Sequence, residues 1–178
     1  NTSIDLTNNL LDSGEKPAVI SAIMKQQTTD RAREVLNHAM DIHAGSAIIK
    51  GKNNFLEKFY KAAPVGITVE GSNTLTRNLI IFGQGLNKSH PHISPILESI
   101  LEENEDKFGR EFRAMTTHVL VCFRNALFEN MGNKNDLDIQ IAEFAHLANV
   151  VALHGGALKS KQMMSADMAD ILSNLYLA

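Results

Sequence analysis

Glu70 is the residue whose type and setting are best suited to chemistry. It lies between the run 65–69, whose β-branched residues favour extended backbone, and a helical pattern that begins at Asn73. Apolar walls disfavour the charged form of a carboxylate, so its pKa rises toward working pH, as a general base requires. The neighbouring Gly71 permits close approach of a ligand, or a backbone angle that other residues avoid. Taken alone, the spacing favours a simpler interpretation, in which Glu70 lies at the N-terminus of the next helix and is stabilised by the helix dipole.

The elements that position Glu70 are predicted to be helices. Four prolines and 11 glycines punctuate the chain, and the apolar residues between them recur at helical spacing. The predicted helices cover residues 4–11, 17–43, 54–62, 73–82, 96–103, 108–130, 136–154 and 166–176. The residues expected to start or stop these helices are Pro17, Pro64, Gly83, Gly85 and Ser165.

This pattern predicts an all-α fold, a helical bundle followed by a helical C-terminal extension. We place the bundle and its candidate site in residues 1–90 and the extension in residues 91–178. The length of 178 residues and the hydrophobic content of 44% suit one ordinary globular domain with a real core. The helix that begins at residue 17 needs long partners to cover its apolar face, so we expect the chain to be a piece of a longer protein.

The bulk composition excludes several classes of function. A net charge of −3 gives no electrostatic reason to expect a nucleic-acid partner. The longest apolar stretches fall far short of the roughly 20 residues of a membrane span, and the first residues carry no secretory signal. The one cysteine, Cys122, is expected to be buried and inert in a reducing compartment. His90 and His92 flank a proline without further ligands nearby, so no metal site is predicted.

The segment from Glu70 to Gly85 resembles the catalytic segment of the acyl-CoA dehydrogenases. It reads Glu70-Gly71-Ser72-Asn73-Thr74-Leu75-Thr76-Arg77 and then Leu79-Ile80-Ile81-Phe82-Gly83-Gln84-Gly85. This form is most similar to that of the large bacterial enzymes, which carry a C-terminal extension. Upstream, Asp41-Ile42-His43-Ala44-Gly45-Ser46-Ala47-Ile48 occupies the place of that family's glycine-rich flavin loop. Residues 147–159 and 165–178 resemble the extension, so the resemblance covers most of the chain and favours the catalytic interpretation of Glu70.

The resemblance implies an FAD-dependent enzyme that oxidises a fatty acyl-CoA to trans-2-enoyl-CoA in fatty-acid β-oxidation. Glu70 corresponds to the family's catalytic base, which takes the α proton while the β hydrogen leaves as hydride to the flavin. The predicted cofactor-side residues are Gly45, Gly71, Ser72 and Thr74. Gly45 maps to a loop that approaches FAD bound mainly by another subunit, so a homo-oligomer is implied. The implied electron acceptor is an electron-transfer flavoprotein, and the compartment is cytoplasmic, with peripheral attachment at the inner membrane as an alternative.

Two positions depart from the family's flavin loop. The family carries glycine where this chain has Ala44 and Ala47, and each added methyl group restricts the backbone angles. One alternative is therefore a non-catalytic helical module that has kept the fold and lost its flavin. Another is a flavin-dependent acyl-CoA oxidase, which uses the same base and passes electrons to oxygen. Because the family's other two domains hold most of the flavin and acyl-CoA contacts, this chain alone is expected to bind FAD poorly and to be inactive.

Overall fold

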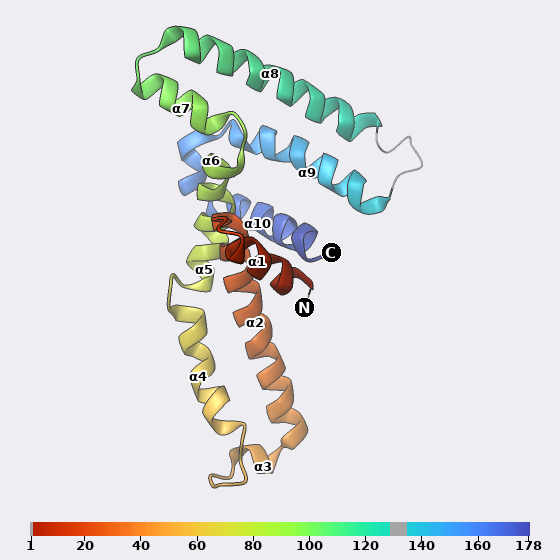
Figure 1. The fold of residues 1–178 in the computed structure, drawn as a ribbon. Coiled ribbons are helices and arrows are strands. Elements are labelled where there is room, and N and C mark those ends of the chain that lie inside the picture. The colour runs from red at the N-terminus through yellow and green to blue at the C-terminus, as the bar shows by residue number, and fades with distance from the viewer. Residues whose placement is uncertain (1, 129–134) are drawn as a thin grey trace. The chain divides into compact units, whose positions relative to one another are not determined.

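The computed structural model describes residues 2–128 and 135–178, and the regular secondary structure of these ranges is helical throughout (Figure 1). The predicted all-α class is thereby confirmed. The chain forms two compact units, Asn1–Arg77 and Asn78–Ala178. The predicted division at residue 90, between a bundle and an extension, stays a prediction. Within the described ranges, no helix combines the length and the apolar character needed to cross a bilayer.

The first unit is built on a helical hairpin. α2 (Ala18–His43) and α4 (Glu57–Thr68) pack side by side, and α3 (Gly45–Ile48) lies at the end of the hairpin where the chain turns back (Figure 1). α1 (Thr2–Asp12) packs on α2, and α5 (Asn73–Leu75) follows α4. Pro17 occupies the N-cap of α2, where the missing N–H of proline costs no helical hydrogen bond.

α4 is longer than the sequence predicts, because it continues through Pro64 to Thr68. The predicted helix end at residue 62 and the predicted extended run after it are therefore wrong, and only Val69, with ψ of 159°, is extended. Packing against α2 explains the difference. A Cβ added at Gly66 would lie 3.4 Å from Thr29 Cγ2, so the two helices approach closely at this point. This tertiary contact overrides the β-branched preference of the local sequence.

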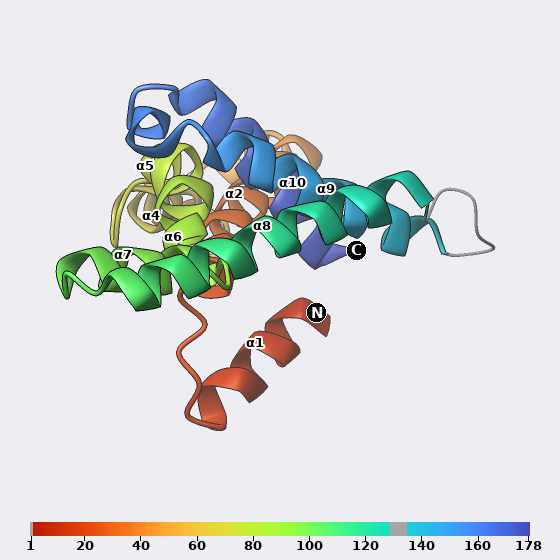
Figure 2. The ribbon, with the colours of Figure 1, turned by 90° about the horizontal axis from the view of Figure 1, so that it is seen from above.

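The second unit begins within a π-helix, Thr76–Gln84, which has the wider i→i+5 hydrogen-bond pattern. α6 (Gly85–Ser89) and α7 (Ile93–Leu101) follow, and α7 packs along α8 (Glu105–Phe128) in both views (Figures 1 and 2). α8 runs antiparallel to α9 (Asp136–Ala152), and the 3-10 helix η3 (Gly155–Lys159) and α10 (Gln162–Leu177) complete the unit. The last two residues of the predicted helix 108–130 lie outside the described ranges.

Two glycines predicted to end a helix lie inside continuous helical structure instead. Gly83 is in the π-helix, where an added Cβ would lie 3.2 Å from Ser165 Oγ, and the buried Gly85 begins α6. The presence of glycine at position 83 is therefore explained by close packing against Ser165 and not by helix termination. The predicted N-cap role of Ser165 is also wrong, because α10 begins at Gln162 with Lys161 at its N-cap. Ser165 is instead fully buried, and its Oγ has no hydrogen-bond partner among the described residues.

Candidate active-site turn

Glu70 lies in a strained turn between α4 and α5. Its φ is +56° and that of Gly71 is +86°, so two successive residues adopt the left-handed region. The unusual backbone angle predicted for Gly71 is confirmed. At Glu70 the same region costs an L-residue about 1–2 kcal/mol, and such outliers concentrate at functional sites. The Glu70 side chain is exposed, so the described residues do not enclose its carboxylate in apolar walls.

Ser72, not Glu70, caps the helix that follows. Ser72 Oγ accepts a hydrogen bond from Leu75 N at 3.2 Å, and Ser72 O accepts one from Thr76 N at 2.8 Å. Glu70 therefore stands two residues before the N-cap, and the interpretation that it merely occupies a helix N-terminus loses its support. Thr74 is exposed on α5. The hydroxyl of Ser72 uses its oxygen as an acceptor in the cap and keeps its proton available to donate elsewhere.

A polar network from α2 holds the turn on both sides of Glu70. The Lys25 ammonium donates to Gly71 O at 2.7 Å, to Asn73 Oδ1 at 2.7 Å and, more weakly, to Ile67 O at 3.4 Å. Asn73 is only 6% exposed, and its amide group donates to Asp30 Oδ1 at 2.7 Å and to Thr29 Oγ1 at 2.8 Å. These contacts link the turn to a helix more than 40 residues earlier in the chain.

The candidate flavin loop begins where α2 ends, at Ala44. This residue has φ of +46° and ψ of −126°, a combination that glycine adopts far more readily than alanine. An alanine thus occupies a backbone position suited to the glycine of the family loop. The adjacent Gly45 is open, because a Cβ added there would meet no heavy atom within 4 Å. Ala47, the second departure from the loop, is only 3% exposed and packs inside α3.

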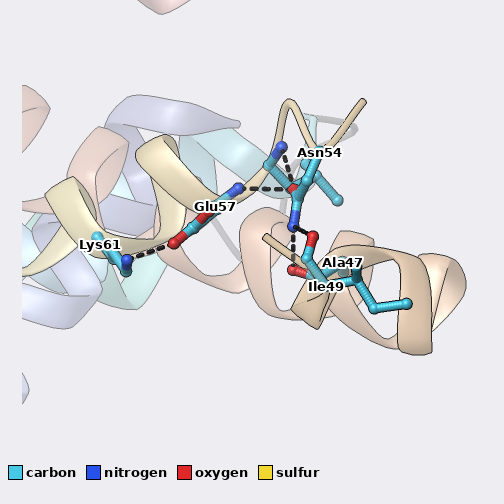
Figure 3. A network of polar contacts seen from close by, with 6 residues as sticks. Ala47, Ile49, Asn54, Glu57 and Lys61 are labelled. Atoms are coloured by element: carbon cyan, nitrogen blue, oxygen red, sulfur yellow. Dashed lines mark hydrogen bonds and ion pairs between the residues drawn. The ribbon is translucent and has the colours of Figure 1, made fainter. Parts of the chain in front are cut away.

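Asn54 ties this loop to the start of α4 (Figure 3). Its amide group donates to Ala47 O at 2.6 Å and to Ile49 O at 3.2 Å. Its Oδ1 accepts from the backbone N–H groups of Leu56 and Glu57, each at 3.0 Å. One side chain therefore satisfies carbonyl groups at the end of one helix and N–H groups at the beginning of the next. These four hydrogen bonds hold the loop against the start of α4.

The predicted site residues fall in two places within the first unit. Glu70, Gly71, Ser72 and Thr74 are together at the end of α4, whereas Gly45 is at the opposite end of the α2–α4 hairpin (Figure 1). The 12 residues of α4 separate the two places, which corresponds to about 18 Å at 1.5 Å per residue. The structure therefore does not bring Gly45 to the Glu70 turn of the same chain.

The open backbone and the available hydrogen-bond donors of these residues fit a bound flavin. The Gly45 backbone is open to a ligand, and the exposed Thr74 and the Ser72 hydroxyl offer hydrogen-bond donors next to the Glu70 turn. The lining of a flavin pocket is absent from the described residues of this unit, because Glu70 and Thr74 face outward.

Lys25 and its partners were not predicted from the sequence. Lys25 and Thr29 lie four residues apart, so helical spacing places them on one face of α2. The spacing alone does not identify the later segment that packs against this face. The strain at Ala44 was anticipated only as a restriction of backbone angles, because the conformation of a single loop residue depends on the elements on either side of it.

The second unit brings His118 of α8 next to His90 and His92, a contact that was not predicted from the sequence. The ring centroids of His90, His92 and His118 lie 5.2–6.1 Å apart, and His118 Nε2 lies 3.5 Å from Sγ of the buried Cys122. The expected burial of Cys122 is confirmed, and His90, in the connection between α6 and α7, is also buried, with an exposed fraction of only 9%. Among the described residues, no group of three or more His, Cys, Asp or Glu is arranged to hold a metal ion.

Comparison with known protein families identifies the family to which this helical chain belongs. Residues 6–83, which include the Glu70 turn and the loop at Gly45, match the family model described as the acyl-CoA dehydrogenase C-terminal domain. Residues 134–178 match a second model, described as the bacterial-type C-terminal region of acyl-CoA dehydrogenases. The chain belongs to the acyl-CoA dehydrogenase family, whose C-terminal part it matches over these two ranges. The search of solved structures gave no match to this chain.

Proposed function

We propose that this chain is the C-terminal part of an FAD-dependent acyl-CoA dehydrogenase that oxidises fatty acyl-CoA to trans-2-enoyl-CoA in fatty-acid β-oxidation. The observation that carries the proposal is the position of Glu70. A carboxylate stands exposed on a left-handed turn, next to a glycine in the same conformation, within the range that matches the family. An exposed carboxylate at the surface of this unit is free to meet a substrate bound by other parts of the enzyme.

Glu70 is the general base in this proposal. One oxygen of its carboxylate takes a proton from the α carbon of the thioester, and the electrons of that C–H bond form the Cα–Cβ double bond. When bound, FAD supplies the two-electron acceptor for the hydride that leaves the β carbon. The left-handed turn holds the Glu70 backbone in one orientation, which limits the directions that the carboxylate can take.

The cofactor-side residues act from two places. Gly71, Ser72 and Thr74 border the base, and Gly45 is about 18 Å away at the other end of α4. This separation supports a homo-oligomer in which the Gly45 loop of one subunit approaches the flavin held by another. Gly45 contributes its backbone there, since it has no side chain to obstruct a ligand. An electron-transfer flavoprotein as acceptor and a cytoplasmic location, with peripheral attachment at the inner membrane as an alternative, belong to the same proposal.

One observation favours a second candidate, a non-catalytic module that has lost its flavin. Ala44 has a backbone suited to glycine, and its methyl group stands at the beginning of the candidate flavin loop. A flavin-dependent acyl-CoA oxidase would use Glu70 in the same way and differs only in passing electrons to oxygen.

Anaerobic mixing of the complete enzyme with a long-chain acyl-CoA tests the proposal. We expect the flavin absorbance to bleach in the wild-type protein and to persist in Glu70→Gln. The control is Glu15→Gln, which changes an exposed carboxylate ahead of α2 and should bleach normally. A purified complete enzyme without flavin would favour the non-catalytic module. Bleaching that survives Glu70→Gln would place the base elsewhere, and rapid reoxidation of the reduced flavin by oxygen would favour the oxidase.

A further inference from the structure

Lys25 makes contacts on both sides of the Glu70 turn. An ammonium group has three protons to donate, and three acceptors lie around Lys25 Nζ: Ile67 O, Gly71 O and Asn73 Oδ1. Ile67 belongs to the last turn of α4, where carbonyl groups have no partner within the helix. Gly71 follows Glu70 directly, and Asn73 is three residues after Glu70. One side chain on α2 thus holds the backbone before and after the candidate base.

Asn73 is a fixed part of this arrangement. Its amide group donates to Asp30 and Thr29, while its Oδ1 accepts from Lys25. Asp30 in turn accepts from Gln26 Nε2 at 2.7 Å through its other oxygen. Lys25 and Asp30, both on α2, are therefore connected through the buried amide group of Asn73. A rigid helix is a more exact support than a loop for groups that must act on a substrate.

The contacts of Lys25 also hold a strained stretch of backbone in place. Glu70 adopts φ of +56° without being glycine, and a residue keeps such an angle only where its surroundings determine it. The bond from Lys25 to Gly71 O fixes the peptide plane that follows the strained pair, and the contact to Ile67 O fixes the helix end that precedes it.

We propose that Lys25 is a positioning residue for Glu70, which acts by holding the 67–73 backbone so that the carboxylate of the base points toward substrate. The inference rests on the proposed function in one respect, namely that Glu70 is the base. It goes beyond that function because it assigns a role to a residue that touches neither substrate nor flavin.

The first measurement uses the chain alone and needs no flavin. Lys25→Met removes the ammonium group and keeps an unbranched side chain that reaches to the ε position, and the control Lys16→Met changes an exposed lysine just ahead of α2. We expect the φ-dependent NMR scalar coupling of residue 70 to report a left-handed backbone conformation in the wild type and in Lys16→Met. In Lys25→Met we expect this coupling to average and the amide hydrogens of residues 71–76 to exchange faster. An unchanged coupling at residue 70 in Lys25→Met would overturn the inference.

The second measurement separates positioning from binding in the complete enzyme. Misplacement of a catalytic group by about 1 Å lowers the rate on the order of 10²-fold, so we expect Lys25→Met to lower kcat by up to this factor. KM for acyl-CoA and the flavin content should stay at the level of Lys16→Met. A wild-type kcat in Lys25→Met, or a loss confined to KM, would contradict a positioning role.

Lys25→Gln is a second variant that tests the same inference if Lys25→Met does not fold. Glutamine retains two N–H donors, but its amide nitrogen is neutral and one bond nearer to the backbone, so it cannot serve all three acceptors. The same loss of kcat is expected, and a wild-type kcat would again overturn the inference. Failure of the proposed function is distinguishable, because it appears as normal turnover in Glu70→Gln. In contrast, an inactive Glu70→Gln together with a fully active Lys25→Gln would reject the role of Lys25 alone.

Discussion

His90 Nε2 and Asn149 Oδ1 lie 3.1 Å apart, in a contact that joins the segment before α7 to α9 across 59 residues of sequence. Both side chains are buried, with exposed fractions of 9% and 4%. His90 Nδ1 accepts a hydrogen bond from the backbone N–H of His92 at 3.2 Å, so this nitrogen carries no proton. Nε2 must therefore hold the proton and donate it to Asn149, whose own amide group donates to Ala145 O at 2.8 Å. The hydrogen bonds thus select one neutral tautomer of His90.

Replacement of Asn149 by alanine should destabilise the chain by about 1–3 kcal/mol, because it leaves the Nε2–H group of His90 buried without an acceptor. The measurement is the free energy of unfolding from urea denaturation at pH 7.5. The control, Asn174→Ala, removes an exposed amide group from α10 and should have little effect. Equal stabilities for the two variants would show that the His90–Asn149 contact contributes nothing.

Stability of the second unit should fall as pH falls below 6.5. Burial is the main cause that lowers the pKa of His118, and the neighbouring His90 and His92 lower it further. The unfolded chain, with an ordinary histidine pKa of 6.5, then binds a proton more readily than the folded chain. The stabilising contribution is therefore complete above pH 6.5 and is lost as pH falls through the lower, folded pKa. An acidic group also borders this cluster, since Glu111 Oε2 lies 3.7 Å from His92 Nδ1.

Urea denaturation at several values between pH 8 and 5 measures this dependence. We expect His118→Gln to have a flatter stability profile than the wild type, whereas the exposed His38→Gln should keep the wild-type slope. A profile that remains equally steep in His118→Gln would assign the pH dependence to other groups.

Ala44→Gly and Ala47→Gly should change stability in opposite directions, although they make the same chemical change three residues apart. Glycine at position 44 relieves the positive φ, and we expect a gain of about 1 kcal/mol after the added entropy of the unfolded chain is subtracted. Glycine at position 47 removes a buried methyl group from α3, and we expect a loss of about 1–2 kcal/mol. Melting temperatures of the two variants provide the comparison, and a loss of stability in Ala44→Gly would show that the backbone at position 44 does not destabilise the folded chain.

Gly83 and Ser165 should be energetically coupled. A Cβ added at Gly83 would lie 3.2 Å from Ser165 Oγ, and this hydroxyl is buried without a hydrogen-bond partner among the described residues. Ser165→Ala removes the atom in conflict, so Gly83→Ala should be better tolerated in that background than in the wild type. For residues in contact we expect a coupling free energy of about 0.5–3 kcal/mol in a double-mutant cycle. Strict additivity of the two substitutions would contradict the packing described at this position.

The features that could be predicted from the sequence depend on local chemistry. The helix 17–43 was predicted to within one residue of α2, since Pro17 and regular apolar spacing mark it without help from the rest of the chain. The unusual angle at Gly71 was also predictable, because glycine adopts it at little cost.

The features that escaped prediction depend on contacts between distant segments. α4 continues through Pro64 because it packs on α2, and local propensity alone gave the opposite result. Lys25 reaches Gly71 across 46 residues of sequence, so neither residue type identifies the other as its partner. Glu70 was identified through its motif, whereas the support for its backbone became visible only once α2 and the turn were placed together.

The backbone at Ala44 has a consequence at the level of the genetic code. Every alanine codon becomes a glycine codon when its second base changes from C to G. The residue that best suits φ of +46° at this position is therefore a single point mutation away, with no third amino acid in between. The same base change in reverse would introduce the strained turn into any relative that carries glycine at the equivalent position.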